Sequence, residues 1–239
     1  MPIPITIAEL TDAFPAFRVG LIVAENLTIQ PQRAGSLDGL IREREITARA
    51  RLSGLELSAI PGIAARAAYK AFGVKQTRYR SSVERLVKNV LAGRDLPAVN
   101  TFVDLYNAIS LTHVLPLSAD DLDQITPPLA FRFARADDNF VDMTGGGEPE
   151  GGEPAGETPK PGEVVYADAA KVLCRRWNWR QDARSLITPS TTRPVVTLQS
   201  NGWGDVGQAM EEIVGLFARH CSGRCRTAVI DAAHPRGEI

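Results

Sequence analysis

The spacing of apolar residues changes along this chain of 239 residues, and the change restricts its fold class. Over residues 36–112, apolar residues recur every three or four positions, as in helices that bury one face. From residue 129 onward, short apolar or alternating runs become common, and these are typical of strands. Helical and strand-like segments do not alternate regularly, so we predict an α+β fold.

Capping residues and glycines mark the ends of several predicted elements. Ser81 and Glu84 have the spacing of a capping box, and Gly93 is a natural helix stop. Helices are predicted over residues 36–52, 58–73, 81–92 and 99–112, and from a cap at Asp205 onward. Strands are predicted over residues 17–24, 129–134, 164–166, 171–174, 195–199 and 227–230. The inner face of the first helix is predicted to hold Leu37, Leu40, Ile41 and Ile46.

The composition is that of an ordinary globular protein, with 44% apolar and 23% charged residues. No apolar run approaches the roughly 18 residues that a membrane span needs. The N-terminus lacks the basic and apolar regions of a secretory signal, and three cysteines are too few for a disulfide framework. We therefore expect a cytoplasmic protein that has no membrane attachment.

Residues 144–162 depart from this composition, because they contain seven Gly, four Pro and four Glu. Such a segment has almost nothing to bury, so we expect a flexible loop.

Charge is distributed in blocks that the net charge of −1 conceals. Residues 42–94 carry 12 Lys and Arg against 4 Asp and Glu, and residues 171–193 carry 6 against 1. Residues 117–168 carry 3 against 12. A basic face of this size attracts polyanions such as nucleic acid, and arginine suits phosphate. The alternative is that these blocks are ordinary charged helix surfaces.

Motifs for metal binding or nucleophilic catalysis are missing from the sequence. The three histidines form no zinc-protease motif, and there is no Gly-x-Ser-x-Gly elbow. His220, Cys221 and Cys225 lack the fourth ligand of a structural zinc site. Cys174 lies in a strand-like run, where a core position is expected. We expect no cofactor and no metal.

One predicted helix carries a polar face. Asn100, Asp104, Asn107 and Ser110 recur at spacings of four, three and three, which places four hydrogen-bonding side chains on one side. Such a face could belong to a functional site. The alternative is a solvated face, although such faces favour Glu and Lys over the weaker helix formers Asn and Asp.

Aromatic and basic residues interleave after residue 174. Trp177 and Trp179 stand among Arg175, Arg176 and Arg180. Such a segment could stack on and hydrogen-bond a nucleotide. The alternative is a strand with an aromatic core side and a charged outer side.

Together these segments resemble the B3/B4 domain, which occurs in the β subunit of bacterial phenylalanyl-tRNA synthetase and in free-standing proteins. The resemblance runs from about Arg80 to Thr192, and its last two motifs are similar to the free-standing proteins. The motifs are Leu96-Pro97-x-Val99-Asn100-x3-Asp104-x2-Asn107-x2-Ser110, Leu115-Pro116 with Asp121, Gly162-Glu163-x2-Tyr166-x-Asp168, and Arg176-Trp177-Asn178-Trp179-Arg180-Gln181.

The resemblance implies a B3/B4-like fold, with mixed sheets, flanking helices and a pocket between the two halves of the domain. We expect one domain over residues 1–239, with a helical, basic part at 1–95 and an α+β part at 96–239. The synthetase domain hydrolyses the ester of a wrongly attached amino acid on tRNA. Free-standing relatives edit in trans, and one group deacylates canavanyl-tRNA(Arg).

The resemblance also assigns candidate roles to residues. Asn107 matches the synthetase's asparagine, and Ser118 stands where the synthetase has a histidine, so these two are the catalytic candidates. The synthetase's substrate-reading glutamate falls near Gln181 or Asp182. The substrate-binding candidates are Asn100, Asp104, Ser110, Glu163, Tyr166, Asp168, Trp177, Asn178, Arg180, Gln181 and Asp182. The candidates for binding tRNA are Arg78, Arg80, Arg85, Arg175 and Arg176.

An activated ester needs only a positioned water and donors for the developing oxyanion, so the missing nucleophile motif is no obstacle. An arginine-like substrate would need a carboxylate fork, for which Glu163, Asp168, Asp104 and Asp182 are candidates. The alternatives are a non-catalytic module that binds tRNA or aminoacyl-tRNA, and a protein that binds free amino acids.

Overall fold

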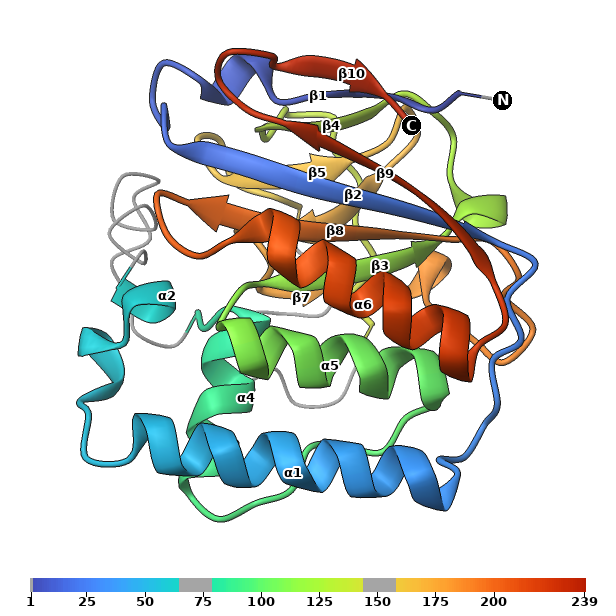
Figure 1. Ribbon diagram of the computed structural model, residues 1–239. Helices are drawn as coiled ribbons and strands as arrows, with labels where there is room; N and C mark the ends of the chain where they lie inside the picture. The colour runs from blue at the N-terminus through green and yellow to red at the C-terminus, as the bar shows by residue number, and fades with distance from the viewer. Residues whose placement is uncertain (1, 65–78, 144–157) are drawn as a thin grey trace.

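The computed structural model describes residues 2–64, 79–143 and 158–239 (Figure 1). Arg78 and residues 144–157 of the predicted loop lie outside the described residues. The helices are α1 (Gly35–Leu52), α2 (Pro61–Ala64), α4 (Ser82–Leu91), α5 (Thr101–His113) and α6 (Val206–His220). The strands are β1 (Pro4–Thr6), β2 (Phe17–Glu25), β3 (Leu117–Asp121), β4 (Leu129–Phe133), β5 (Val164–Ala167), β6 (Val172–Arg175), β7 (Arg180–Gln181), β8 (Pro194–Asn201), β9 (Arg224–Ile230) and β10 (Arg236–Glu238).

The strands form two sheets. One has six strands in the order β10-β1-β4-β5-β6-β7, and it is mixed because β1 runs parallel to β4. The other has four antiparallel strands in the order β3-β8-β2-β9. The predicted α+β class, with mixed sheet structure and flanking helices, is confirmed.

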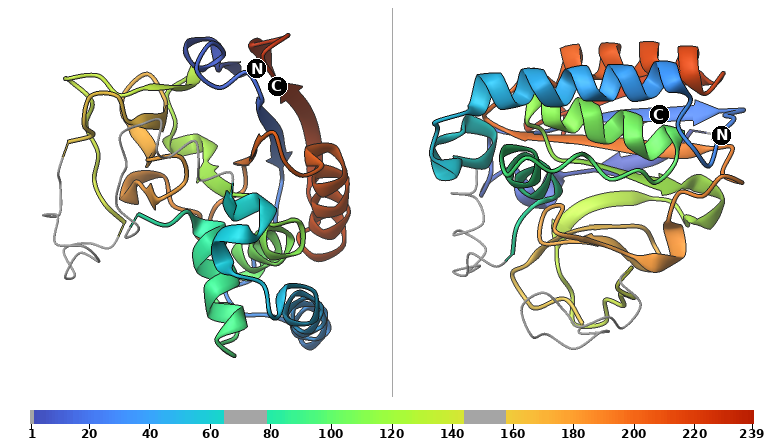
Figure 2. Two further views of the ribbon diagram at one scale, coloured as in Figure 1. Left: turned by 90° about the vertical axis from the view of Figure 1, so that its left-hand side faces the viewer. Right: turned by 90° about the horizontal axis from the view of Figure 1, so that it is seen from below.

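The molecule has three layers, which Figure 2 shows edge-on: helices, the four-stranded sheet and the six-stranded sheet. β2 explains the order, because apolar residues occupy both of its faces. Ile22 and Ala24 pack in the core beneath the helices, whereas Val19, Leu21 and Val23 pack in the core between the sheets. The four-stranded sheet is therefore buried on both sides.

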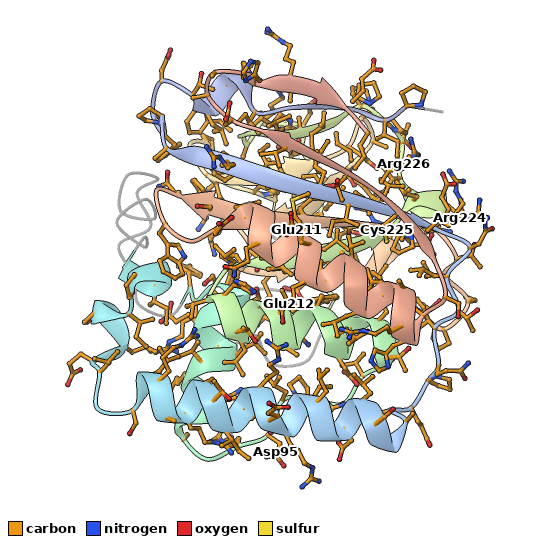
Figure 3. All side chains as sticks on the ribbon, in the orientation of Figure 1. Asp95, Glu211, Glu212, Arg224, Cys225 and Arg226 are labelled. Carbon is orange, nitrogen blue, oxygen red and sulfur yellow. The ribbon has the colours of Figure 1, made fainter. Side chains whose placement is uncertain are left out.

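Charged side chains tie the helices together. Arg49 donates from Nε to Val90 O at the end of α4, and Arg51 donates from Nη2 to Thr112 O near the end of α5. Glu212 on α6, labelled in Figure 3, pairs with His113 on α5 and with Arg44 on α1. Three of the arginines in the basic block of residues 42–94 thus have structural partners.

Several predicted elements are confirmed, with differences that have physical causes. Ser81 caps α4 by accepting a hydrogen bond from Glu84 N at 3.4 Å, and Asp205 caps α6. The predicted inner face of α1 was wrong at Ile46, which is 63% exposed. Glu45 is buried instead, because its carboxylate accepts a hydrogen bond from Leu96 N at 2.5 Å.

Strands from the first 95 residues lie inside both sheets. β2 lies between β8 and β9, and β1 lies between β10 and β4. The N-terminal segment therefore supplies strands to both sheets, in addition to α1, α2 and α4.

Candidate active site

The space between the two sheets is apolar at one end and polar at the other. In β3 and β8, the residues that alternate with the helix-facing ones point toward the six-stranded sheet. Four of these residues are polar and buried. We call them, together with two neighbours from the β7 region, the inter-sheet polar cluster: Ser118, Asp120, Thr197, Gln199, Gln181 and Ser185.

Asp120 is held in this cluster through one of its two oxygens. Its Oδ1 accepts hydrogen bonds from Gln181 Nε2 at 3.0 Å and from Ser185 Oγ at 2.6 Å. Gln181 Nε2 also donates to Ala119 O at 2.5 Å, so Gln181 joins the edge strands of the two sheets. The Asp120 residue is 1% exposed.

Burial raises the pKa of Asp120 to about 7, although the hydrogen bonds from Ser185 and Gln181 act to lower it. Asp120 in turn helps raise the pKa values of two tyrosines, the partly buried Tyr106 on α5 and the buried Tyr166 on β5. In both tyrosines burial is the larger cause. Groups from both sheets and from α5 therefore share one electrostatic environment.

A chain of hydrogen bonds runs beside Asp120 on the same face of the four-stranded sheet. Ser118 Oγ lies 2.8 Å from Thr197 Oγ1, and Gln199 Nε2 donates to Thr197 Oγ1 at 3.3 Å. Gln199 Oε1 and the Tyr166 hydroxyl are both buried and have no hydrogen-bond partner among the described residues. Buried polar atoms without a partner are rare, and here two border one cluster.

Three of the four residues on the predicted polar face of α5 form structural hydrogen bonds, and the fourth forms none with the described residues. Asn100 caps the helix by accepting from Val103 N, and Asp104 accepts from Val99 N and Arg33 Nε. Ser110 Oγ donates to Leu115 O at the helix end. Only Asn107 among these four is half-buried and makes no side-chain hydrogen bond with the described residues.

The other carboxylates expected to read a cationic substrate also have fixed partners. Asp168 accepts from the backbone of Thr126, Ala170 and Lys171 and from Lys171 Nζ. Burial acts to raise the pKa of Asp168, but these donors outweigh it and lower the pKa. Asp182 is bound by Arg184 and by Val141 N. The arrangement of these two residues is that of turn-forming carboxylates.

Glu163, the last of the four, is buried in a strong ion pair. Arg175 Nε lies 2.8 Å from its Oε1, and Arg176 Nε lies 3.3 Å from its Oε2. Arg175 and Arg176 are each 3% exposed. Their burial and pairing remove the charge argument for placing them on tRNA phosphates.

The tryptophan segment packs into the protein. Trp177 contacts Phe14 and Phe17 in the core between the sheets. Trp179 lies against Tyr79, with Arg176 and Arg180 over its ring. This arrangement favours the core alternative that the sequence left open. Asn178 binds the start of α4, where its side chain accepts from Ser82 Oγ and its backbone oxygen from Ser82 N.

The acidic block at residues 117–168 and the basic block at residues 171–193 neutralise each other. Each of the six cations in residues 171–193 lies within 4.0 Å of a carboxylate, and most of these carboxylates belong to the acidic block at 117–168. Of the remaining tRNA-binding candidates in the described residues, Arg80 pairs with Glu84 at 3.2 Å and is one-third exposed. Arg85 donates to Trp179 O at 2.8 Å.

Metal-ligating side chains do not gather in groups in the described parts of the structure. These residues contain no group of three or more His, Cys, Asp or Glu that could hold a metal ion. Cys174 is buried, which raises its pKa to about 12, as for an inert core thiol. No described helix is both long enough and apolar enough to cross a membrane.

Sequence reasoning missed Asp120. The motif contained its neighbour Asp121, whose side chain accepts from Asp123 N and Thr191 Oγ1. The signal that could have found Asp120 is strand alternation from Ser118, because residues two apart share a face. No strand is predicted over this segment from the sequence, so Asp120 is not placed on one face with Ser118.

The chain was compared with known proteins. The solved structures include a similar one, an N-terminal fragment of the phenylalanyl-tRNA synthetase β subunit from Pyrococcus horikoshii, with 13% identity and a TM-score of 0.43. The match covers 93% of this chain and 50% of that one, so this chain spans about half the fragment's length. No curated protein gave a significant match. The family model described as the B3/4 domain matches residues 64–221, about two thirds of the chain, and the protein therefore belongs to the B3/4 domain family.

Proposed function

We propose that this protein is a trans-editing deacylase that hydrolyses the ester bond of mischarged aminoacyl-tRNA. One observation carries the proposal: in a B3/4 domain, a buried carboxyl, Asp120, stands between the sheets with one oxygen unbound by the described residues. Around it are a hydroxyl pair, an unpartnered tyrosine hydroxyl and an unpartnered amide oxygen. These groups suit a bound polar ligand and a water molecule.

Ester hydrolysis fits this chemistry because an aminoacyl ester is already activated. The protein has to orient a water molecule and supply hydrogen-bond donors to the oxyanion that develops on the carbonyl. Hydroxyls of Ser118, Thr197 and Tyr166 are candidate donors. Asn107, next to Tyr106 on α5, would hold the terminal ribose or the ester, as the match to the synthetase's asparagine implies.

Canavanyl-tRNA(Arg) is the finer form of the proposal. An arginine-like side chain needs an ionised carboxylate, and Glu163, Asp168, Asp104 and Asp182 are all occupied by internal donors. Each oxygen of these four carboxylates already accepts a hydrogen bond, so a guanidinium-like group would have to compete with these donors.

Single-turnover hydrolysis of tRNAs mischarged with several amino acids, canavanine included, tests the proposal. The expected result is hydrolysis well above the uncatalysed rate for at least one mischarged tRNA, and little for the correctly charged one. Binding of tRNA without hydrolysis would instead identify a non-catalytic binding module. Binding of free amino acids with no salt-dependent binding of tRNA would identify an amino-acid-binding protein.

A further inference from the structure

The two oxygens of Asp120 have different hydrogen-bonding environments. Oδ1 accepts two hydrogen bonds, whereas Oδ2 accepts none from the described residues. Some side-chain atoms of the described residues have neither a hydrogen-bond partner nor contact with solvent, and Oδ2 is not one of them. It therefore borders space that solvent can reach, although the residue as a whole is buried.

The other buried aspartates among the described residues accept hydrogen bonds at both oxygens. Asp104 accepts from Val99 N at Oδ1 and from Arg33 Nε at Oδ2. Asp168 and Asp182 accept two hydrogen bonds at each oxygen. These three buried aspartates are thus bound at both oxygens, whereas Asp120 is bound at one.

The groups around Asp120 leave it able to exchange a proton. Lys171 favours its ionised form and Asp182 disfavours it, while Tyr106, Tyr166 and Cys174 are the other titratable groups that its charge affects. All three of these have pKa values above their ordinary ones, so they stay protonated near neutral pH. A carboxyl with a pKa of about 7 is suited to general base catalysis at that pH.

We propose that Asp120 is the general base of the deacylation, with Oδ2 taking a proton from the hydrolytic water; this rests on the proposed function. The water oxygen bonds to the ester carbonyl carbon as its proton passes to Oδ2. The tetrahedral intermediate then collapses, the bond from the carbonyl carbon to the ribose oxygen breaks, and the proton returns from Oδ2 to that oxygen. The products are a free amino acid and tRNA with a free hydroxyl.

Gln181 and Ser185 are positioning residues in this proposal. They hold Oδ1 from β7 and from the 3-10 helix Ala183–Ser185, and rotation of the carboxyl would break both hydrogen bonds, so Oδ2 stays directed away from them. Their hydrogen bonds also lower the pKa of Asp120. Removal of one donor should therefore shift the pH at which the base becomes active, which a purely structural residue would not do.

The experiment is a pH profile of single-turnover deacylation, between pH 5.5 and 8.5, with the uncatalysed rate subtracted. The substrate is the mischarged tRNA that the full-length protein hydrolyses fastest. The variants are Asp120→Asn, Ser185→Ala and, as a matched control, Asp123→Asn, whose carboxylate is half-exposed on the surface nearby. Thermal melting of each variant shows that it is folded.

For the wild type, the rate should rise about tenfold per pH unit and level off near pH 7. Asp120→Asn should lose about 100-fold or more, which is the usual contribution of a general base. Ser185→Ala should shift the profile upward by about one pH unit, since a hydrogen bond to a charged group has about that effect. The substrate's own α-amino group also titrates in this range, but Ser185→Ala would not move it.

The outcomes separate the two proposals. Hydrolysis of no mischarged tRNA by the wild type would overturn both the function and the base. If the wild type is active and the rate of the Asp120→Asn variant lies within threefold of the wild-type rate, only the assignment of Asp120 as the general base is overturned. An unshifted profile in a folded, active Ser185→Ala variant would do the same, even if Asp120→Asn failed to fold.

Discussion

Tyr166 stacks on Phe131, with ring centroids 4.6 Å apart and ring planes 19° from parallel, while its hydroxyl remains buried without a partner among the described residues. The ring thus has a structural role, and the hydroxyl has none that the described protein supplies. A buried hydroxyl that forms no hydrogen bond destabilises the folded state, so its retention suggests a ligand.

Tyr166→Phe should therefore separate stability from activity. We expect the free energy of unfolding to rise by about 1 kcal/mol, because the variant keeps the stacked ring and removes an unsatisfied polar group. Deacylation should fall, because the ligand loses a hydrogen bond. Denaturant unfolding and single-turnover rates measure the two effects. A loss of stability would show that the hydroxyl already has a structural partner, such as a bound water.

Asp120 should make the protein less stable as the pH rises. Its pKa is about 7 in the folded protein against 3.8 in the unfolded chain, so the folded state holds the proton over that interval. The free energy of unfolding should fall between about pH 4 and pH 7, by as much as about 4 kcal/mol. Above pH 7 this contribution should stay constant.

Asp120→Asn removes this titration, so its stability relative to the wild type should improve steadily from pH 4 to pH 7. Urea unfolding at several pH values measures the difference. A wild-type–variant difference that does not change with pH would mean that Asp120 titrates at an ordinary pKa.

Asp168→Asn should destabilise the protein without changing its preference among substrates. The folded-state pKa of Asp168 is lowered, so its carboxylate stabilises the protein above pH 3.8 and loses this effect as the pH falls through the folded-state pKa. At pH 7 we expect a loss of about 1–3 kcal/mol, since the amide leaves Lys171 without its charge partner. Rates on arginine-like and neutral substrates should change by the same factor. A lower rate on the arginine-like substrate alone would show that Asp168 recognises the substrate side chain.

Arg80 and Arg193 offer a matched test of where tRNA binds. Arg80 lies in the block at residues 42–94, and Arg193 pairs with Asp123 in the block that is internally neutralised. We expect Arg80→Gln to lower the slope of log affinity against log salt by about 0.7–0.9, the contribution of one phosphate contact. Arg193→Gln should leave the slope unchanged. Equal slopes for all three proteins would exclude Arg80 from the tRNA interface.

The sequence predicts the fold well where one element carries its own pattern. The caps at Ser81 and Asp205 and the alternation around Leu129 are local signals, and the structure confirms each of them. β1, β7 and β10 were missed because each has only two or three residues. Strands of this length have too few residues to show a period, and they exist because distant segments pair with them.

The site was harder to predict, because structural and functional polar residues look alike in a sequence. Asn100, Asp104 and Ser110 share a helix face with Asn107, yet three of these four satisfy backbone groups or an arginine. Sequence spacing shows which residues share a face, but it cannot show which have found a partner. Asn107 is distinguished by having no such partner in the part of the chain that the structure describes, and this is visible only after folding.

The central position of β2 affects how this protein is made. Glu25 at the end of β2 pairs with Arg226 of β9, which lies 201 residues later in the chain. During synthesis, β2 leaves the ribosome with two apolar faces and both edges unpaired, and it stays so until β8 and β9 have emerged. Through most of translation the nascent chain therefore exposes a segment prone to aggregation, which chaperones would have to shield.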